Sequence, residues 1–191
     1  LCEKPLAMNA TECRSMIEAA ARAKRVGMTG FNWRYTAAMQ RFHAMVEAGA
    51  LGRLFHANLR WMGSRWADEG APATWRMDRA QAGHGAMGDM GVHAIDIIRW
   101  HFGEFAAVSA QSGIAYPSKT VPGVGKATDA EDYCQVTARL ASGALVAFII
   151  SRAARGANQQ TIEAYGSEGA LEYRLDRAKP RWWRGELRHA G

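Results

Sequence analysis

Hydrophobic and polar residues alternate over several short stretches of this chain, mostly in its second half. In residues 54–62, for example, the odd positions from 55 to 61 carry Phe, Ala, Leu and Trp, and the even positions between them carry His, Asn and Arg. A period of two places alternate side chains on opposite faces of a β-strand. The strands that this alternation predicts are residues 54–62, 106–111, 133–140, 145–152, 161–165 and 170–175.

Glycine-containing turns separate two pairs of these strands. The sequence Ala-Ser-Gly-Ala at 141–144 lies between one pair, and Gly-Ser-Glu-Gly at 166–169 lies between the other. Short turns of this kind join antiparallel strands. The second half of the chain therefore predicts an open, mostly antiparallel sheet, and helices earlier in the chain would cover one of its faces.

Three earlier segments show the spacing of an amphipathic helix, and a glycine closes each of them. Asn9 can cap the first helix, because Glu12 follows it three residues later as in a capping box. The second helix is expected at about 37–48 and the third at about 89–102. A short strand at 28–31 follows the first helix, which gives the alternation of an α/β unit.

Two long stretches, residues 63–88 and 112–130, show no regular period. The first is rich in Gly, Trp and Arg. Irregular loops of this length are uncommon in compact domains and usually carry function. We therefore expect ligand-binding residues within 63–88.

Composition and charge narrow the class of partner. Apolar residues make up 48% of the chain and charged residues 22%, which permits a sizeable core and disfavours disorder. The longest apolar run, residues 144–150, is too short to cross a bilayer. The net charge of +6 comes without a basic block of five or more residues. We expect ordinary surface charge with a few anion contacts, and neither a nucleic-acid nor a membrane partner.

The cysteines point to a reducing compartment. Cys2, Cys13 and Cys134 are odd in number and widely spaced, and no C-x-x-C motif occurs. This pattern disfavours a disulfide framework or a zinc site, so we expect a cytoplasmic protein without a metal. The chain begins at Leu1 without a methionine, and we expect the natural N-terminus to lie upstream.

A first chemical cluster is the sequence Cys-Glu-Lys-Pro at 2–5. Pro5 fixes its own backbone and favours an extended conformation for Lys4, which is thereby directed from a rigid turn ahead of a helix. The simpler alternative is a lysine in a solvent-exposed loop.

A second cluster follows the glycine-rich segment 83–88. Asp89, His93 and Asp96 are spaced i, i+4 and i+7, so a helix would align them on one face. At the start of a helix, exposed N–H groups and the dipole favour an anion at Asp89 and keep the imidazole of His93 neutral, as a base requires. Alternatively, Asp89 is only a helix cap, His93 a buried hydrogen-bonded residue and Asp96 a charge in solvent.

Together these segments resemble the glucose–fructose oxidoreductase, inositol dehydrogenase and rhizopine-catabolism (Gfo/Idh/MocA) family. The most specific features are E-K-P and D-x-G-x-H in this order. The matching stretches are residues 3–5, 30–35, 49–52, 75–76, 85–96 and 165–169. Trp33 departs from the pattern, because several inositol-dehydrogenase-like relatives carry a second basic residue there.

The resemblance implies an α/β chain in which an α+β domain with an open, mostly antiparallel sheet follows the tail of a Rossmann domain. Residues 1–33 would end the nucleotide-binding domain, and residues 34–191 would form most of a substrate-binding and oligomerisation domain. The glycine-rich turn that holds NAD or NADP is expected before Leu1. The fragment by itself is therefore expected to be inactive.

The family also implies the reaction: reversible oxidation of a secondary alcohol on a sugar or cyclitol, with hydride transfer to a nicotinamide. His93 would take the hydroxyl proton, Lys4 would stabilise the developing alkoxide, and Asp89 would hold a substrate hydroxyl or orient His93. The remaining residues assigned by resemblance are Glu3, Lys4, Pro5, Asn32 and Arg34 for the cofactor, and Trp75, Arg76 and His84, beside Asp89 and His93, for the substrate.

Other interpretations stay open. The domain could be a non-catalytic sugar-binding or assembly module, since the uncovered sheet face suits a homodimer or homotetramer. Trp61, Trp66 and Trp75 could stack on a sugar or simply pack in the core. The sequence Arg-Trp-Trp-Arg at 181–184 resembles a nucleic-acid stacking element, but a sheet strand or a ragged terminus is the simpler interpretation.

Overall fold

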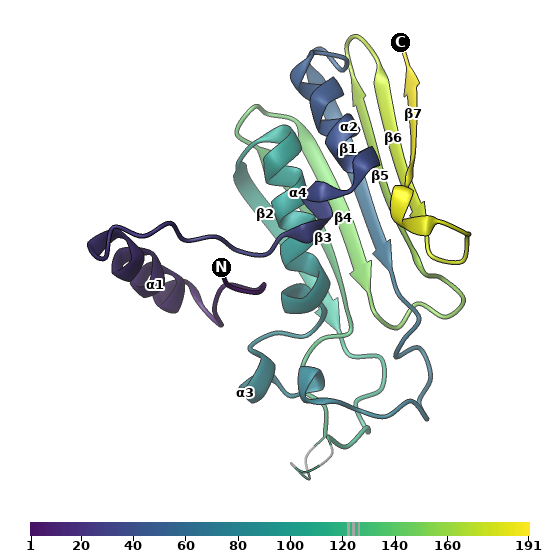
Figure 1. Cartoon of the computed structure of the whole chain (residues 1–191). Coiled ribbons are helices and arrows are strands. Elements are labelled where there is room, and N and C mark those ends of the chain that lie inside the picture. The colour runs from purple at the N-terminus through teal and green to yellow at the C-terminus, as the bar shows by residue number, and fades with distance from the viewer. Residues whose placement is uncertain (122, 124, 126) are drawn as a thin grey trace.

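A seven-stranded sheet forms the body of the molecule (Figure 1). The computed structural model describes residues 1–121, 123, 125 and 127–191. The strands are β1 (Leu54–Met62), β2 (Phe105–Gly113), β3 (Tyr133–Leu140), β4 (Leu145–Ser151), β5 (Gln159–Gly166), β6 (Ala170–Asp176) and β7 (Glu186–Ala190). Their order is β2-β3-β4-β1-β5-β6-β7. β1 and β4 run parallel, whereas the other neighbouring pairs are antiparallel.

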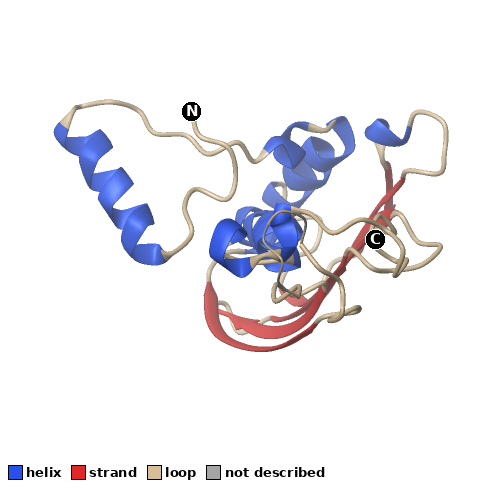
Figure 2. Cartoon of the chain, turned by 90° about the horizontal axis from the view of Figure 1, so that it is seen from below, coloured by secondary structure: helices blue, strands red, loops and turns tan. Residues whose placement is uncertain are grey.

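Helices cover one face of this sheet (Figure 2). The helical segments are α1 (Ala10–Arg22), η1 (Asn32–Tyr35), α2 (Ala37–Glu47), η2 (Trp75–Met77), α3 (Arg79–Ala82), η3 (Met87–Gly91), α4 (Val92–Phe102) and η4 (Trp182–Arg184). The open, mostly antiparallel sheet with helices on one face, predicted from the sequence, is thereby confirmed.

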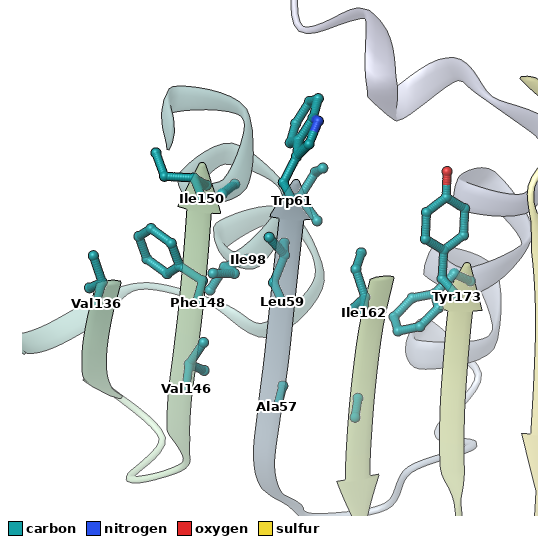
Figure 3. Packing of buried hydrophobic residues seen from close by; sticks show 14 of the residues in the cluster. Ala57, Leu59, Trp61, Ile98, Val136, Val146, Phe148, Ile150, Ile162 and Tyr173 are labelled. Atoms are coloured by element: carbon teal, nitrogen blue, oxygen red, sulfur yellow. The ribbon is translucent and has the colours of Figure 1, made fainter. Parts of the chain in front are cut away.

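The core lies between the sheet and the helices α2 and α4. Figure 3 shows Ala57, Leu59 and Trp61 of β1 on the same face, together with Ile98 of α4. Leu59 and Ile98 are almost fully buried. Strand β3 alternates strictly between exposed and buried positions, as a strand with one covered face must. Burial of these apolar surfaces is the main contribution to the stability of the sheet–helix sandwich.

Several sequence predictions differ from the structure in detail. Phe55 was expected beside Ala57, but the register shifts between Leu54 and His56, and 46% of the Phe55 side chain is exposed. A bulge of this kind redirects a side chain without ending the strand. The strand expected at 28–31 is reduced to an isolated parallel bridge between Thr29 and Cys2.

Two further differences concern helical turns. The third helix does not begin at Asp89: a π-helical turn, η3, precedes α4. Residues 181–184 form no strand. Trp182–Arg184 is a short 3₁₀ helix, and the sheet instead gains β7, which the sequence analysis missed.

Residues 1–31 extend away from the sheet (Figure 1). Asn9 caps α1 as predicted, accepting a hydrogen bond of 3.0 Å from the amide of Glu12. The helix ends at Arg22, however, before the expected Gly27. No residue of α1 is buried, and 61% of Ile17 is exposed. Contacts between this segment and the body of the molecule include those of Lys4 with Asp89 and of Phe31 with His93.

The two irregular stretches pack on each other at one end of the sheet. Trp66 and Met77 from the first stretch and Val121 from the second share a small core. Beside it, the buried guanidinium of Arg152 donates to the Asp132 carboxylate at 2.9 Å and to the Arg76 carbonyl at 3.1 Å. The predicted 112–130 stretch includes residues 122, 124 and 126, which lie outside the described part of the chain.

Two observations on the described residues concern a membrane and a metal. None of their helices has the length and apolar character that a membrane crossing requires. The same residues contain no group of three or more His, Cys, Asp or Glu side chains placed to hold a metal ion.

Candidate functional site

Lys4 reaches across the molecule to the start of the third helix. Its ammonium group donates to the Asp89 carbonyl at 2.6 Å and to the Asp89 carboxylate at 3.0 Å. The peptide bond between Lys4 and Pro5 is cis. The side chains of Lys4 and Asp89 are both partly buried, with exposures of 19% and 31%. Two residues 85 positions apart are thus held together, as a shared site requires.

Asp89 itself lies in the π-helical turn η3. Turns of this kind are rare and frequently occur at functional sites. Asp89 does not cap the helix, because its own amide is already bonded to the Gly85 carbonyl at 3.1 Å. The anion at the helix start is instead Glu131, whose carboxylate accepts from the amides of Gly85 at 2.9 Å and Met87 at 3.0 Å. The carboxylate of Asp89 is consequently left to face Lys4.

His93 follows one turn later and is 4% exposed. Its ring lies 5.5 Å from that of Trp61 and 5.7 Å from that of Phe31, between centroids. Among the described residues, its buried Nδ1 atom has no hydrogen-bond partner. Burial, and to a smaller extent the positive charge of Lys4, lower the pKa of His93 to about 4. The imidazole is therefore neutral at pH 7, and burial is the largest cause.

One cleft of about 400 Å³ brings these groups together. It is lined by Lys4, Trp33, Trp61, Gly63, Ser64, Arg65, Trp66, Asp89, Met90, His93, Arg152, Asn158 and Arg177. Its volume lies in the range of small-molecule pockets. The structure thus joins Lys4, Asp89 and His93 in a single cavity with three tryptophans.

Asp96, the third member of the predicted cluster, has a structural partner. It is buried, and it pairs through both carboxylate oxygens with the guanidinium of Arg34, one of these contacts being 2.8 Å. Arg34 also lies over the ring of Trp100. Asp96 is therefore not the solvent-facing charge considered above, and Arg34 is turned toward α4. Asn32 is exposed in η1, and neither Asn32 nor Arg34 lines the cleft around His93.

The other predicted residues gather in a second cleft of about 360 Å³. Trp75, Arg76 and His84 line it together with Glu3 and Pro5. Lys4 and Asp89 line both clefts and so form the wall between them. Residues predicted to contact substrate and residues predicted to contact cofactor therefore occur together in this second cleft, and Asn32, Arg34 and His93 are the predicted residues that do not line it.

The sequence analysis expected ligand-binding residues within 63–88 and considered Trp66 as a stacking residue, but it assigned no role to Arg65, Arg152 or Arg177. Residues 63–66 follow β1, and Arg152 follows β4. Because β1 and β4 are parallel neighbours, their carboxyl ends meet at one edge of the sheet, where Figure 1 shows the loops that follow them. Ligand sites commonly form at such edges. The positions after the two strands could therefore have been predicted to form a site only if the parallel pairing of β1 and β4 had been known.

Glycines 83, 85 and 88 have the G-x-G-x-x-G spacing of a pyrophosphate-binding turn. In that motif a strand leads into the turn, whereas here the helix α3 precedes it. In addition, the Glu131 carboxylate already accepts from two of the N–H groups that would face a phosphate. These glycines therefore do not form a dinucleotide-binding turn.

Comparison with known proteins identifies the family. Residues 39–172 match the profile of the GFO/IDH/MocA C-terminal domain. The chain belongs to this family. It is 34% identical over 193 residues to a levoglucosan dehydrogenase from Pseudarthrobacter phenanthrenivorans, covering 93% of this chain and 49% of that protein. It is 32% identical over 171 residues to a myo-inositol 2-dehydrogenase from Thermotoga maritima, covering 89% and 47%.

Solved structures agree with this assignment. A levoglucosan dehydrogenase in complex with NADH and levoglucosan superimposes with a TM-score of 0.84 at 31% identity. The superposition covers 99% of this chain and 53% of that chain. This Gfo/Idh/MocA chain thus spans about half the length of the relatives it matches, and those relatives are dehydrogenases of sugars and cyclitols.

Proposed function

We propose that this chain carries the substrate-binding half of an NAD(P)-dependent dehydrogenase that oxidises a secondary alcohol of a sugar or cyclitol. The observation that carries the proposal is the meeting of Lys4, Asp89 and His93 in one cleft with aromatic walls. Membership in a family that contains sugar dehydrogenases supports the same reaction class.

In this proposal His93 acts as the base. Its Nδ1 is enclosed by protein, so Nε2 is the nitrogen that we assign to the alcohol proton. The lowered pKa keeps the imidazole neutral, but it also makes His93 a weak base, so proton transfer needs help at the oxygen. Lys4 supplies that help, since an ammonium group beside the substrate oxygen favours its alkoxide form.

Asp89 holds Lys4 in position and is also within the cleft. Its carboxylate can accept from a neighbouring substrate hydroxyl while it also accepts from the ammonium group of Lys4. The apolar faces of Trp33 and Trp61 offer surfaces on which a sugar ring can pack. These residues would orient the substrate, and water would be excluded from the reacting carbon.

NAD or NADP would supply the hydride acceptor. Glu3, Lys4 and Pro5 at the second cleft are the residues of this chain that we assign to its nicotinamide end. We further infer that residues 1–33 end a nucleotide-binding domain, as the isolated, unburied α1 suggests. The pyrophosphate would bind elsewhere, since the glycines at 83–88 are engaged by Glu131.

The test uses the intact protein that carries this chain and follows the reduction of NAD⁺ and NADP⁺ with a panel of sugars and cyclitols. His93→Ala is expected to reduce kcat by about 10²–10⁴, the usual contribution of general acid–base catalysis. His189→Ala is the matched control, because His189 is an exposed imidazole on β7, outside the cleft. Full turnover by His93→Ala would remove this residue from the reaction, and binding without turnover in the wild type would favour a non-catalytic sugar-binding module.

A further inference from the structure

Positive charge dominates the cleft around His93. Four of its lining residues are cationic, namely Lys4, Arg65, Arg152 and Arg177, whereas Asp89 is the acid among them. Lys4 is neutralised by Asp89, and Arg152 is neutralised by the buried carboxylate of Asp132. The remaining positive charge of the cleft therefore lies on Arg65 and Arg177.

Arg177 contacts aromatic rings and not acids. Its guanidinium carbon lies 5.6 Å from the ring centre of Trp33 and 5.1 Å from that of Trp182. Arg65 is placed similarly, 5.2 Å from the ring of Trp66. Within the described part of the chain, neither arginine has a carboxylate at salt-bridge distance. A guanidinium that lies on an indole is held in place while its N–H donors stay available to a ligand.

The arginines share the cleft with the proposed reacting groups. From Arg177 a series of ring contacts leads through Trp33 and Trp61 to His93, with centroid distances of 5.2 Å and 5.5 Å for its last two steps. Arg177 and His93 also line the same cleft, which is the basis for assigning both to one ligand. At about 400 Å³ the cleft suits one sugar ring with its substituents.

We infer that the substrate is an anionic sugar, one that bears a carboxylate or phosphate group bound by Arg177 and Arg65. The inference rests on the proposed function for the position of the reacting hydroxyl, but its charge argument stands on the cleft alone. Arg65 and Arg177 are exposed residues at the cleft, so their N–H donors are accessible to a ligand. Carboxylate and phosphate oxygens match the guanidinium fork, whereas a neutral sugar offers it only hydroxyl groups.

The test measures binding, not turnover. Isothermal titration of the intact protein, saturated with NAD⁺, compares glucuronate, glucose 6-phosphate and glucose, which share one ring and differ at one substituent. We expect at least one of the two anions to bind about tenfold or more tightly than glucose, the equivalent of one charge-assisted contact. Which anion is preferred distinguishes a carboxylate site from a phosphate site.

Substitutions then test whether Arg177 and Arg65 cause the preference for the anion. Arg177→Gln combined with Arg65→Gln is expected to remove the preference for the anion over glucose. Arg155→Gln is the matched control, because Arg155 is exposed outside the cleft. Equal affinity for all three ligands, no measurable binding of either anion, or an anion preference that survives the double variant would overturn the inference. Turnover of a neutral sugar together with that result would leave the proposed reaction intact.

Discussion

His93 and Lys4 are coupled through charge. The ammonium group of Lys4 disfavours a second positive charge on the imidazole, and burial disfavours it more strongly. Both effects lower the pKa of His93, so the histidine is neutral above a pH of about 4. Lys4 therefore has two proposed roles, since it favours the alkoxide and keeps its neighbour able to accept a proton.

Lys4→Met tests this coupling in the chain itself. Removal of the positive charge is expected to raise the pKa of His93, while burial keeps it below the ordinary value of 6.5. The titration of the His93 ring by NMR measures the shift, with His93→Gln to assign the signal. Lys24→Met, in the segment after α1, is the control and should leave the signal unchanged. An unaltered His93 titration in Lys4→Met would contradict the contact geometry.

At the scale of elements, the π-helical turn η3 depends on close packing against Glu131. A Cβ atom on Gly85 would lie 2.0 Å from the Glu131 carbonyl oxygen and 2.6 Å from its nitrogen. Both are backbone atoms, so the clash cannot be relieved by a side-chain rotation. Glycine at this position is thus a condition for the turn that presents Asp89.

Gly85→Ala is therefore expected to destabilise the chain by about 1–3 kcal/mol, the usual cost of overpacking. The measurement is urea denaturation, from which the free energy of unfolding is obtained. Gly70→Ala is the matched control, because its added Cβ would meet only the Asp68 side chain at 3.5 Å. If both variants unfold at the same urea concentration, the packing of η3 on Glu131 is not as described.

The whole molecule presents one sheet face without helices (Figure 2). Tyr133, Leu145 and Tyr165 are each at least 40% exposed, and strand alternation places them opposite the buried face of β3, β4 and β5. Exposed apolar side chains on a sheet face without helices are typical of a subunit interface. We propose that the chain forms a homodimer or homotetramer through this face.

Leu145→Lys combined with Tyr165→Lys is expected to convert the oligomer to a monomer, because each substitution would place an uncompensated charge in the interface. Size-exclusion chromatography with light scattering gives the mass of each species. Val26→Lys is the control, since Val26 is 95% exposed and lies outside the sheet. A monomeric wild-type chain at micromolar concentration would reject the proposed interface.

The sequence by itself determined the local elements of this protein. Strand β1 has the predicted bounds, 54–62, and α2 begins at the predicted Ala37, because a period of two or of 3.6 residues is set by neighbours in the chain. Lys4, Asp89 and His93 were likewise recognisable from their motifs, although their roles remain predictions. The start of α4 was not predictable, since the π-helical turn is held by Glu131, a residue more than 40 positions away.

Only the tertiary structure decided which residues share a cleft. The parallel pairing of β1 with β4 brings Arg65 and Arg152 to one edge of the sheet. No short turn joins these two strands, so the sequence does not indicate that they pair. The same long-range packing pairs Arg34 with Asp96 and places Trp75 in the second cleft. Such pairings depend on the register of distant strands and on which charges become buried together, and local periodicity carries no information about either.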